Sequence, residues 1–214
     1  SDDLVDRVVQ RFIVLIYQVL QFVGNVVVGQ CFFVGSADIM YRTAEILGKK
    51  EDAAYYGDVA AKAREAFMNE YVTPNGVVSS DTQTAYVLVL HFNILPENMR
   101  AKAVERLTGN ITRYKNHITT GFLGTPHICN VLTDNGRSDV AYKLLLQKTC
   151  PSWIYPVTMG ATTIWERWDS IRPNGVIPNN GMNSFNHYAY GAVVDWLYGT
   201  AAGIRPGKDG GFDK

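Results

Sequence analysis

The chain has 214 residues, 47% of them hydrophobic, and its 20 basic residues are balanced by 20 acidic ones. This length suits one domain that buries about 70% of its unfolded surface, and the apolar content argues against disorder. Because a neutral chain has no broad attraction to phosphate backbones or anionic lipids, the charge balance argues against nucleic acid as a partner.

The N-terminal stretch "RFIVLIYQVLQFVGNVVVG" (11–29) is strongly apolar. A signal anchor or membrane span is one interpretation. Gln18, Gln21 and Asn25 interrupt the run, however, and a buried helix has the same appearance. We therefore expect a core helix and no membrane partner. No signal peptide is recognised, which leaves a cytoplasmic and a secreted bacterial location both open.

Helical patterns then follow one another, separated by short turns. The expected helices cover 3–22, 35–47, 50–71, 81–92, 96–109, 125–135, 137–148 and 184–199. Asp81 and Thr125 are predicted as N-caps, and Gly48 and Gly136 as helix stops. The stretch 149–183 reads as irregular, with weak strand signal only at 77–79 and 153–158. These patterns predict an all-α chain of about eight helices in antiparallel hairpins.

The tryptophans gather in the C-terminal third, between residues 153 and 196. The stretch "ATTIWERWDS" (161–170) sets Glu166 between Trp165 and Trp168. Flat apolar rings and amide side chains such as Asn186 are what a pyranose ring and its hydroxyls require. The pattern predicts a sugar site with Glu166 as its catalytic carboxylate. The alternative is ordinary core packing around a salt-bridged structural glutamate.

His187 falls in the first turn of the helix expected over 184–199. The positive end of a helix dipole favours a neutral imidazole, which can hydrogen-bond a hydroxyl. A purely structural histidine is the alternative.

The remaining chemistry-bearing residues show no further site. The three cysteines are scattered without a C-x-x-C pair, so we expect reduced, mostly buried thiols: Cys31, Cys129 and Cys150. The other histidines have no ligand spacing, and no phosphate loop, dinucleotide fingerprint or Ser-His-Asp elbow occurs. We expect neither a metal nor a cofactor.

Four blocks carry a family resemblance. They are "SDTQTAYVLVLHFNILPE", "TTGFLGTPHICNVLTDNG", "PSWIYPVTMGATTIWERWDS" and "GMNSFNHYAYGAVVDWLYGTAAGI". Spanning about 80–204 in this order, they resemble the catalytic domain of bacterial α-L-rhamnosidases. The resemblance implies an (α/α)6 toroid of the six-hairpin glycosidase type and inverting hydrolysis of terminal L-rhamnosides. It implies Glu166 as the general base and His187 as a substrate-binding residue, with Trp165, Trp168 and Asn186 shaping the pocket.

The chain also departs from the family pattern. The family's general acid lies in an acidic, arginine-containing block before a Gly-Trp pair, and nothing in 1–35 matches that block. Gly24 is followed by Asn25 where the family has a Gly-Asp-Trp-Leu-like stretch. About eight helices also fall short of the twelve of a toroid. We therefore expect 1–214 to be a single helical domain, the C-terminal part of an incomplete toroid, with 1–31 a poorly matched apolar segment.

An incomplete toroid exposes apolar surface, so the expected partners are a rhamnoside substrate and either the missing N-terminal part of the enzyme or a second copy of the chain. Three functions stay open at this point. They are a rhamnosidase-like hydrolase, a non-catalytic carbohydrate-binding fragment or pseudo-enzyme without the acid, and a helical interaction scaffold.

Overall fold

The computed structural model describes residues 2–178, 181–207 and 211–212, with side chains from Gly24 onward. The chain forms two compact units, Ser1–Ala103 and Val104–Lys214. Throughout the described ranges the regular structure is helical, apart from one isolated antiparallel bridge between Val72 and Val78. The predicted all-α class is confirmed.

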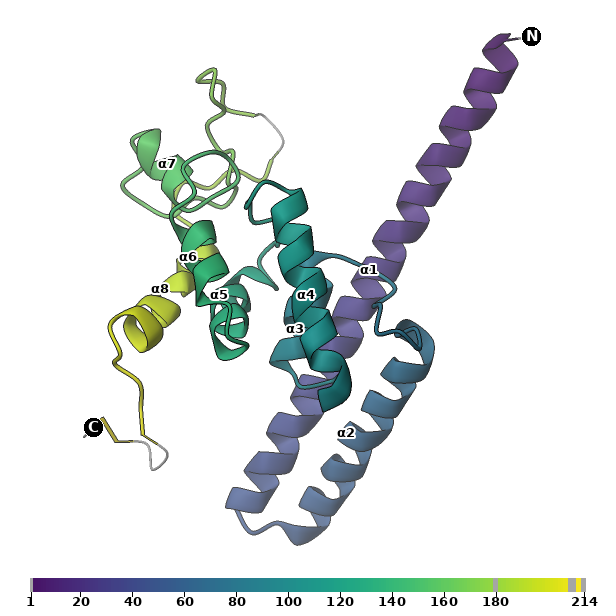
Figure 1. Ribbon diagram of the computed structural model, residues 1–214, viewed down its shortest axis with the longest axis vertical. Helices are drawn as coiled ribbons and strands as arrows, with labels where there is room; N and C mark the ends of the chain where they lie inside the picture. Colours follow the sequence, from purple (N-terminus) through teal and green to yellow (C-terminus); the bar gives the residue numbers. More distant parts are fainter. Residues whose placement is uncertain (1, 179–180, 208–210, 213–214) are drawn as a thin grey trace. The chain divides into compact units, whose positions relative to one another are not determined.

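The first unit is built on a long helical hairpin. Helix α1 (Asp2–Ile46) and helix α2 (Lys50–Tyr71) are joined by a short turn and lie side by side (Figure 1). The prediction of separate helices over 3–22 and 35–47 was wrong, because no proline or turn sequence intervenes and single glycines only weaken a helix. Gly48, at φ +67°, stops α1 as predicted. Among the helices in the described ranges, none has the length and apolarity needed to cross a membrane.

The hairpin buries one face of each helix. Small and branched side chains of α1 at helical spacing pack inward, and α2 contributes an alanine and a phenylalanine: Val27, Cys31, Val34, Ala37 and Ala44, with Ala60 and Phe67. At the rim of this interface the Arg64 guanidinium pairs with the Asp38 carboxylate. Apolar burial at period 3.6 therefore sets the register of the two helices.

Helix α3 (Gln83–His91) completes the first unit and is buried along nearly its whole length. Its N-cap is Thr82, whose hydroxyl accepts from the Ala85 N–H at 3.2 Å, so the predicted Asp81 cap was wrong. Asp81 has φ +43°, whereas an N-cap needs extended backbone. Its carboxylate instead accepts from the Tyr86 hydroxyl at 2.7 Å.

The remaining helices are shorter than α1 and α2. They are α4 (Glu97–Arg113), α5 (Thr125–Asp134), α6 (Ser138–Leu145), α7 (Ile154–Thr158), the 3₁₀ helix η1 (Ala189–Ala192), α8 (Val193–Trp196) and the π-helical turn η2 (Leu197–Ala201). Within the second unit α5 contacts α6, η1 and α8. Trp196 of α8 is 1% exposed and its indole N–H donates to the Thr133 hydroxyl at 2.9 Å. Helix α5 is thus the centre of this unit.

Three boundaries in this unit differ from the predictions. Gly124 occupies the N-cap position of α5, because the Thr125 hydroxyl pairs with the Thr120 hydroxyl at 2.8 Å rather than with the helix. The weak strand signal at 153–158 forms helix α7 instead. The last helix begins at Ala189 and not near Ser184, because the residues before it pair with another segment. Gly136, at φ +75°, ends α5 as predicted.

Gly35 of α1 offers a test of close packing in the first unit. A Cβ at Gly35 would lie 2.4 Å from the Cδ1 and Cε1 atoms of Phe92. We expect Gly35→Ala to displace that ring and to lower the free energy of unfolding by about 1–3 kcal/mol in urea titrations. Gly29→Ala is the matched control, since nothing lies within 4 Å of its new Cβ. It should stabilise α1 by about 0.5–1 kcal/mol. Equal stability of the two variants would contradict the packing.

The buried thiols predict a pH dependence. Burial raises the pKa of Cys31 and of Cys129 from 9.0 to about 12. The folded state therefore holds these protons more tightly, so the stability they contribute is complete below pH 9 and is lost as the pH rises toward 12. We expect the free energy of unfolding to fall above pH 9, and less steeply in Cys129→Ala. Rapid labelling of both thiols by a thiol reagent in the native protein at pH 8 would contradict their burial.

Candidate functional site

Two segments of the second unit pair and bring the predicted site residues together. The Glu166 N–H donates to the Ser184 carbonyl at 2.9 Å, and the His187 N–H donates to the Ile164 carbonyl at 2.8 Å. The segments 163–166 and 184–187 thus run antiparallel, and the Thr163 hydroxyl adds a bond to the Phe185 carbonyl. This pairing places Glu166 and His187, distant in sequence, on adjacent backbone.

The Glu166 carboxylate is anchored at one oxygen. Its Oε2 accepts from the Ser184 N–H at 2.8 Å, while Oε1 has no hydrogen bond in the described part of the chain. The side chain lines an open groove of about 620 Å³ together with residues of the following loop: Ile177, Pro178, Gly181, Asn183, Ser184 and Phe185. This volume lies within the roughly 300–1,000 Å³ of small-molecule sites. A half-buried carboxylate with one oxygen held can bind a water or a hydroxyl at the other.

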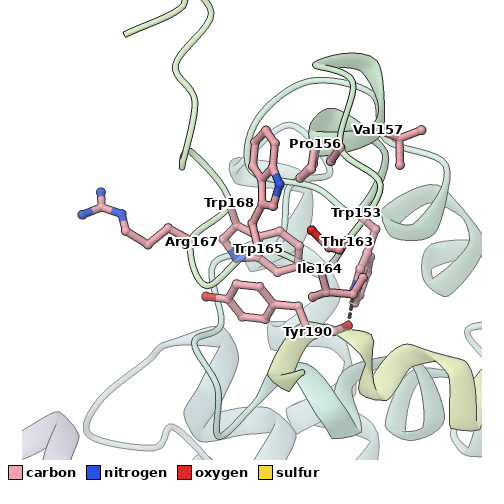
Figure 2. Close-up of a pocket in the computed structure, with 10 residues that line it drawn as sticks. Trp153, Pro156, Val157, Thr163, Ile164, Trp165, Arg167, Trp168 and Tyr190 are labelled. Atoms are coloured by element: carbon pink, nitrogen blue, oxygen red, sulfur yellow. Dashed lines mark hydrogen bonds between the residues drawn. The ribbon is translucent and has the colours of Figure 1, made fainter. Parts of the chain in front are cut away.

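The tryptophans face a different hollow. Trp165 is 4% exposed and meets Phe185 edge-on. Trp168 stacks on Tyr190 with centroids 3.8 Å apart, and Trp153 donates its indole N–H to the Tyr190 carbonyl at 2.9 Å (Figure 2). Together they line a pocket of about 40 Å³, which Glu166 does not line. That volume suits one or a few water molecules and is too small for a sugar ring.

His187 precedes the last helix rather than lying in its first turn, which corrects the prediction. Its ring is parallel to Phe122, at 4.8 Å, and to Tyr188, at 5.7 Å. Nδ1 accepts from the Ala189 N–H at 3.4 Å. In a neutral ring that accepts at Nδ1, Nε2 carries the hydrogen. His187 can therefore donate to a hydroxyl through Nε2.

Asn186 lies between the anchor of Glu166 and His187. Its backbone N–H donates to the Ser184 hydroxyl at 3.2 Å, and that hydroxyl donates to the Asn186 carbonyl at 3.2 Å. Its amide side chain is exposed and makes no hydrogen bond within the described ranges. The amide is thus available to a ligand.

The arginines near Glu166 pair with another carboxylate. Arg167 forms a two-pronged interaction with Asp169, at 3.0 and 3.2 Å, and Arg172 lies 3.9 Å from the same carboxylate. Burial raises the pKa of Tyr190, an effect that Arg167 opposes and that Asp169 and Glu166 reinforce. Because Asp169 pairs with both Arg167 and Arg172, these two arginines do not bind the Glu166 carboxylate. In the described part of the chain no group of three or more His, Cys, Asp or Glu side chains could hold a metal ion.

Sequence reasoning missed Ser184 and Asn183 as neighbours of Glu166. Ser184 acts through its backbone N–H, which any residue but proline provides, so no side-chain pattern marks it. Asn183 stood among several asparagines of the same loop. In the sequence, only the position of Asn183 and Ser184 in the "GMNSFNH" block, close to His187, indicated that they belong to the site.

Comparison with known families gives one match that covers most of the chain. The profile of the bacterial alpha-L-rhamnosidase 6 hairpin glycosidase domain matches residues 18–201. An alpha-L-rhamnosidase of Streptomyces avermitilis is 51% identical over 184 residues, which are 86% of this chain and 18% of that protein. An alpha-L-rhamnosidase of Formosa agariphila is 45% identical over 182 residues, or 84% of this chain and 19% of that protein. The chain spans about a fifth of the length of these relatives.

Solved structures give the same result. The crystal structure of the Streptomyces avermitilis alpha-L-rhamnosidase complexed with L-rhamnose superposes with a TM-score of 0.82 at 51% identity, covering 85% of this chain and 18% of that one. The native enzyme from Aspergillus terreus superposes with a TM-score of 0.81 at 38% identity, covering 82% of this chain and 20% of that one. The predicted fold, an incomplete (α/α)6 toroid of the six-hairpin glycosidase type, is confirmed.

The Trp153–Tyr190 hydrogen bond tests the packing beneath the site. Trp153→Phe keeps a ring against Trp168 but leaves the Tyr190 carbonyl without its donor. We expect the free energy of unfolding to fall by about 1–3 kcal/mol, together with a weaker near-ultraviolet circular dichroism signal from the Trp168 stack. Tyr198→Phe is the control, because the Tyr198 side chain is 61% exposed. If the two variants unfold alike, the bond does not hold this stack.

Proposed function

Because the chain belongs to the bacterial α-L-rhamnosidase six-hairpin glycosidase family, we propose that it supplies the general base, Glu166, of an inverting hydrolase acting on terminal L-rhamnosides. The observation that supports this most is the bond from the Ser184 N–H to Glu166 Oε2 at 2.8 Å. A backbone amide fixes the direction of the carboxylate that would act as the base. It also leaves Oε1 as the atom that receives a proton.

The chemistry follows from that arrangement. A water bound at Glu166 Oε1 attacks the anomeric carbon of rhamnose from the face opposite the leaving group. As the water oxygen forms its bond to carbon, its proton passes to Glu166 and the bond from carbon to the leaving oxygen breaks. The leaving oxygen takes a proton from a separate acid. The configuration at the anomeric carbon is therefore inverted.

Substrate binding falls to the side chains beside the base. His187 presents Nε2–H, and Asn186 presents an exposed amide, to sugar hydroxyls. We assign Trp165 and Trp168 the role of supporting the segment that carries Glu166, because the pocket that they line is too small for a sugar ring. The relatives' structure complexed with L-rhamnose supports this class of ligand.

The general acid comes from outside this chain. Asp169, the next carboxylate after Glu166, is occupied by Arg167 and Arg172. The chain spans about a fifth of its relatives, so the acid and the remaining helices belong to sequence outside these residues. Helix α1 supports such a partner, because Phe33 and Met40, seven residues apart on the helix, are 52% and 44% exposed, and Leu47 in the turn that follows is 66% exposed. We propose that the remainder of the enzyme covers this stripe, with self-association as the alternative.

Glu166→Gln tests the role of the carboxylate in the full-length polypeptide that contains this chain. Glutamine keeps the shape but cannot accept a proton, so kcat on an aryl rhamnoside should fall by about 10²–10⁴-fold while the melting temperature stays unchanged. Glu105→Gln, at an exposed position of α4, is the matched control and should keep full activity. An unchanged kcat for Glu166→Gln would remove Glu166 from the mechanism.

A carbohydrate-binding fragment is the second candidate, because Asp169, the next carboxylate along the chain, is paired with Arg167 and Arg172. In that case titration with L-rhamnose changes the tryptophan fluorescence, but no aryl rhamnoside is cleaved. The absence of both signals would leave a helical scaffold. An activated phenol needs little acid assistance, so weak turnover of such a substrate would favour the hydrolase even for the isolated chain.

A further inference from the structure

The loop that follows Ser170 is closed by one asparagine. Asn183 Nδ2 donates to the Ser170 carbonyl at 3.3 Å. Ser170 is 0% exposed, and its N–H and hydroxyl both bond to the Arg167 carbonyl, at 3.3 and 3.1 Å. Because a carbonyl can accept only from the amide NH₂, the orientation of the Asn183 side chain is determined. Asn183 thus ties its backbone to a buried, doubly held anchor.

The same residue is joined directly to the group that holds the base. The peptide bond from Asn183 to Ser184 carries the N–H that donates to Glu166 Oε2 at 2.8 Å. The Ser184 carbonyl accepts from the Glu166 N–H at 2.9 Å. A shift of Asn183 therefore moves the donor on which the carboxylate rests. Misplacement of a reacting group by about 1 Å can cost on the order of 10² in rate.

The amide at position 183 is not explained by packing alone. Asn183 lines the groove of Glu166, and its Oδ1 is buried without a hydrogen-bond partner in the described part of the chain. A buried carbonyl without a donor destabilises the fold, and a leucine of similar shape would avoid that cost. Unlike leucine, the Asn183 amide donates a hydrogen bond to the Ser170 carbonyl.

We infer that Asn183 is a positioning residue for the proposed general base: by bonding Ser170 it sets the place of the Ser184 N–H, and through it the Glu166 carboxylate. The inference rests on the proposed function of Glu166. It concerns the rate of the chemical step, since the side-chain amide of Asn183 acts on Glu166 through its bond to the Ser170 carbonyl.

The experiment uses the full-length polypeptide and an aryl L-rhamnoside with a good leaving group. Asn183→Leu removes the donor while keeping the side-chain shape. We expect kcat to fall about 10–100-fold with KM within about two-fold of the parent, because the variant moves the base while His187 and Asn186 stay in place to bind the sugar. Asn130→Ala is the matched control, because it also removes an amide hydrogen bond, the one to Asp195 at 3.0 Å, and should keep its kcat.

Added azide tests the site through Glu166→Ala. Azide attacks the anomeric carbon without losing a proton, forming the carbon–nitrogen bond as the carbon–oxygen bond breaks and the leaving phenol takes a proton from the acid. It should therefore restore part of the lost rate in Glu166→Ala, where the shortened side chain leaves room for the anion, and yield a rhamnosyl azide. Asn183→Leu keeps the Glu166 carboxylate, which repels an anion, so circular dichroism and the melting temperature check its fold instead. If Asn183→Leu does not fold, Asn183→Ala removes the same donor without apolar bulk and is read in the same way.

The outcomes distinguish the two proposals. Loss of kcat in Asn183→Leu at parental KM and with a parental circular dichroism spectrum, together with azide rescue of Glu166→Ala, supports the inference. Parental kcat in Asn183→Leu, a loss equal to that of Asn130→Ala, or a loss accompanied by an altered circular dichroism spectrum in both Asn183→Leu and Asn183→Ala, would overturn the inference without bearing on the role of Glu166. Full turnover by Glu166→Ala would instead overturn the proposed function itself.

Discussion

The backbone pairing of residues 163–166 with 184–187 is the constraint on which the candidate site depends. Glu166 exchanges two hydrogen bonds with Ser184, one from its own N–H and one to its carboxylate. Without this pairing the carboxylate would lie on an irregular loop with no defined direction. With it, one carboxylate oxygen is held and His187 lies on the adjacent segment. Irregular chain can position chemistry in this way when each backbone group finds a partner.

The pairing is held in place by a packed aromatic layer. Trp168 stacks on Tyr190, and Trp153 bonds the Tyr190 carbonyl, so the segment carrying Glu166 rests on the start of the last helix. Beneath this layer α5 contacts η1 and α8. The tryptophans thus provide a rigid support, while the groove beside Glu166 is lined by aliphatic and small polar residues. Large rings with few rotatable bonds are well suited to such support.

Hydrolysis by inversion needs two carboxyl groups on opposite sides of the sugar. This chain offers one that is anchored by a backbone amide and another, Asp169, that arginines neutralise. In the proposed mechanism the two roles are divided between distant parts of a toroid, because the acid and the base must face each other across the substrate. The exposed Phe33 and Met40 of α1 offer an apolar surface to the proposed remainder of the enzyme.

Hydrophobic periodicity and glycine positions predicted much of the helical structure. They failed where contacts between residues distant in sequence set the bounds of a helix. Helix α2 and the stops at Gly48 and Gly136 followed from periodicity and from the freedom of glycine at positive φ. The continuity of α1 did not follow, since Gly24, Asn25 and Gly29 stand between the two predicted helices, and single glycines only weaken a helix. The start of the last helix was placed too early, because the bonds from the Glu166 N–H to the Ser184 carbonyl and from the His187 N–H to the Ile164 carbonyl hold residues 184–187 in a non-helical segment.

The sequence by itself determined the all-helical class, the family and the position of Glu166 between two tryptophans. Each of these depends on patterns of residues that are close together in the sequence. Only the tertiary structure decided that the carboxylate is held by Ser184, and that the tryptophans line a separate pocket too small for a sugar. Both depend on hydrogen bonds and ring contacts between residues far apart in the chain. Such contacts leave no periodic trace along it.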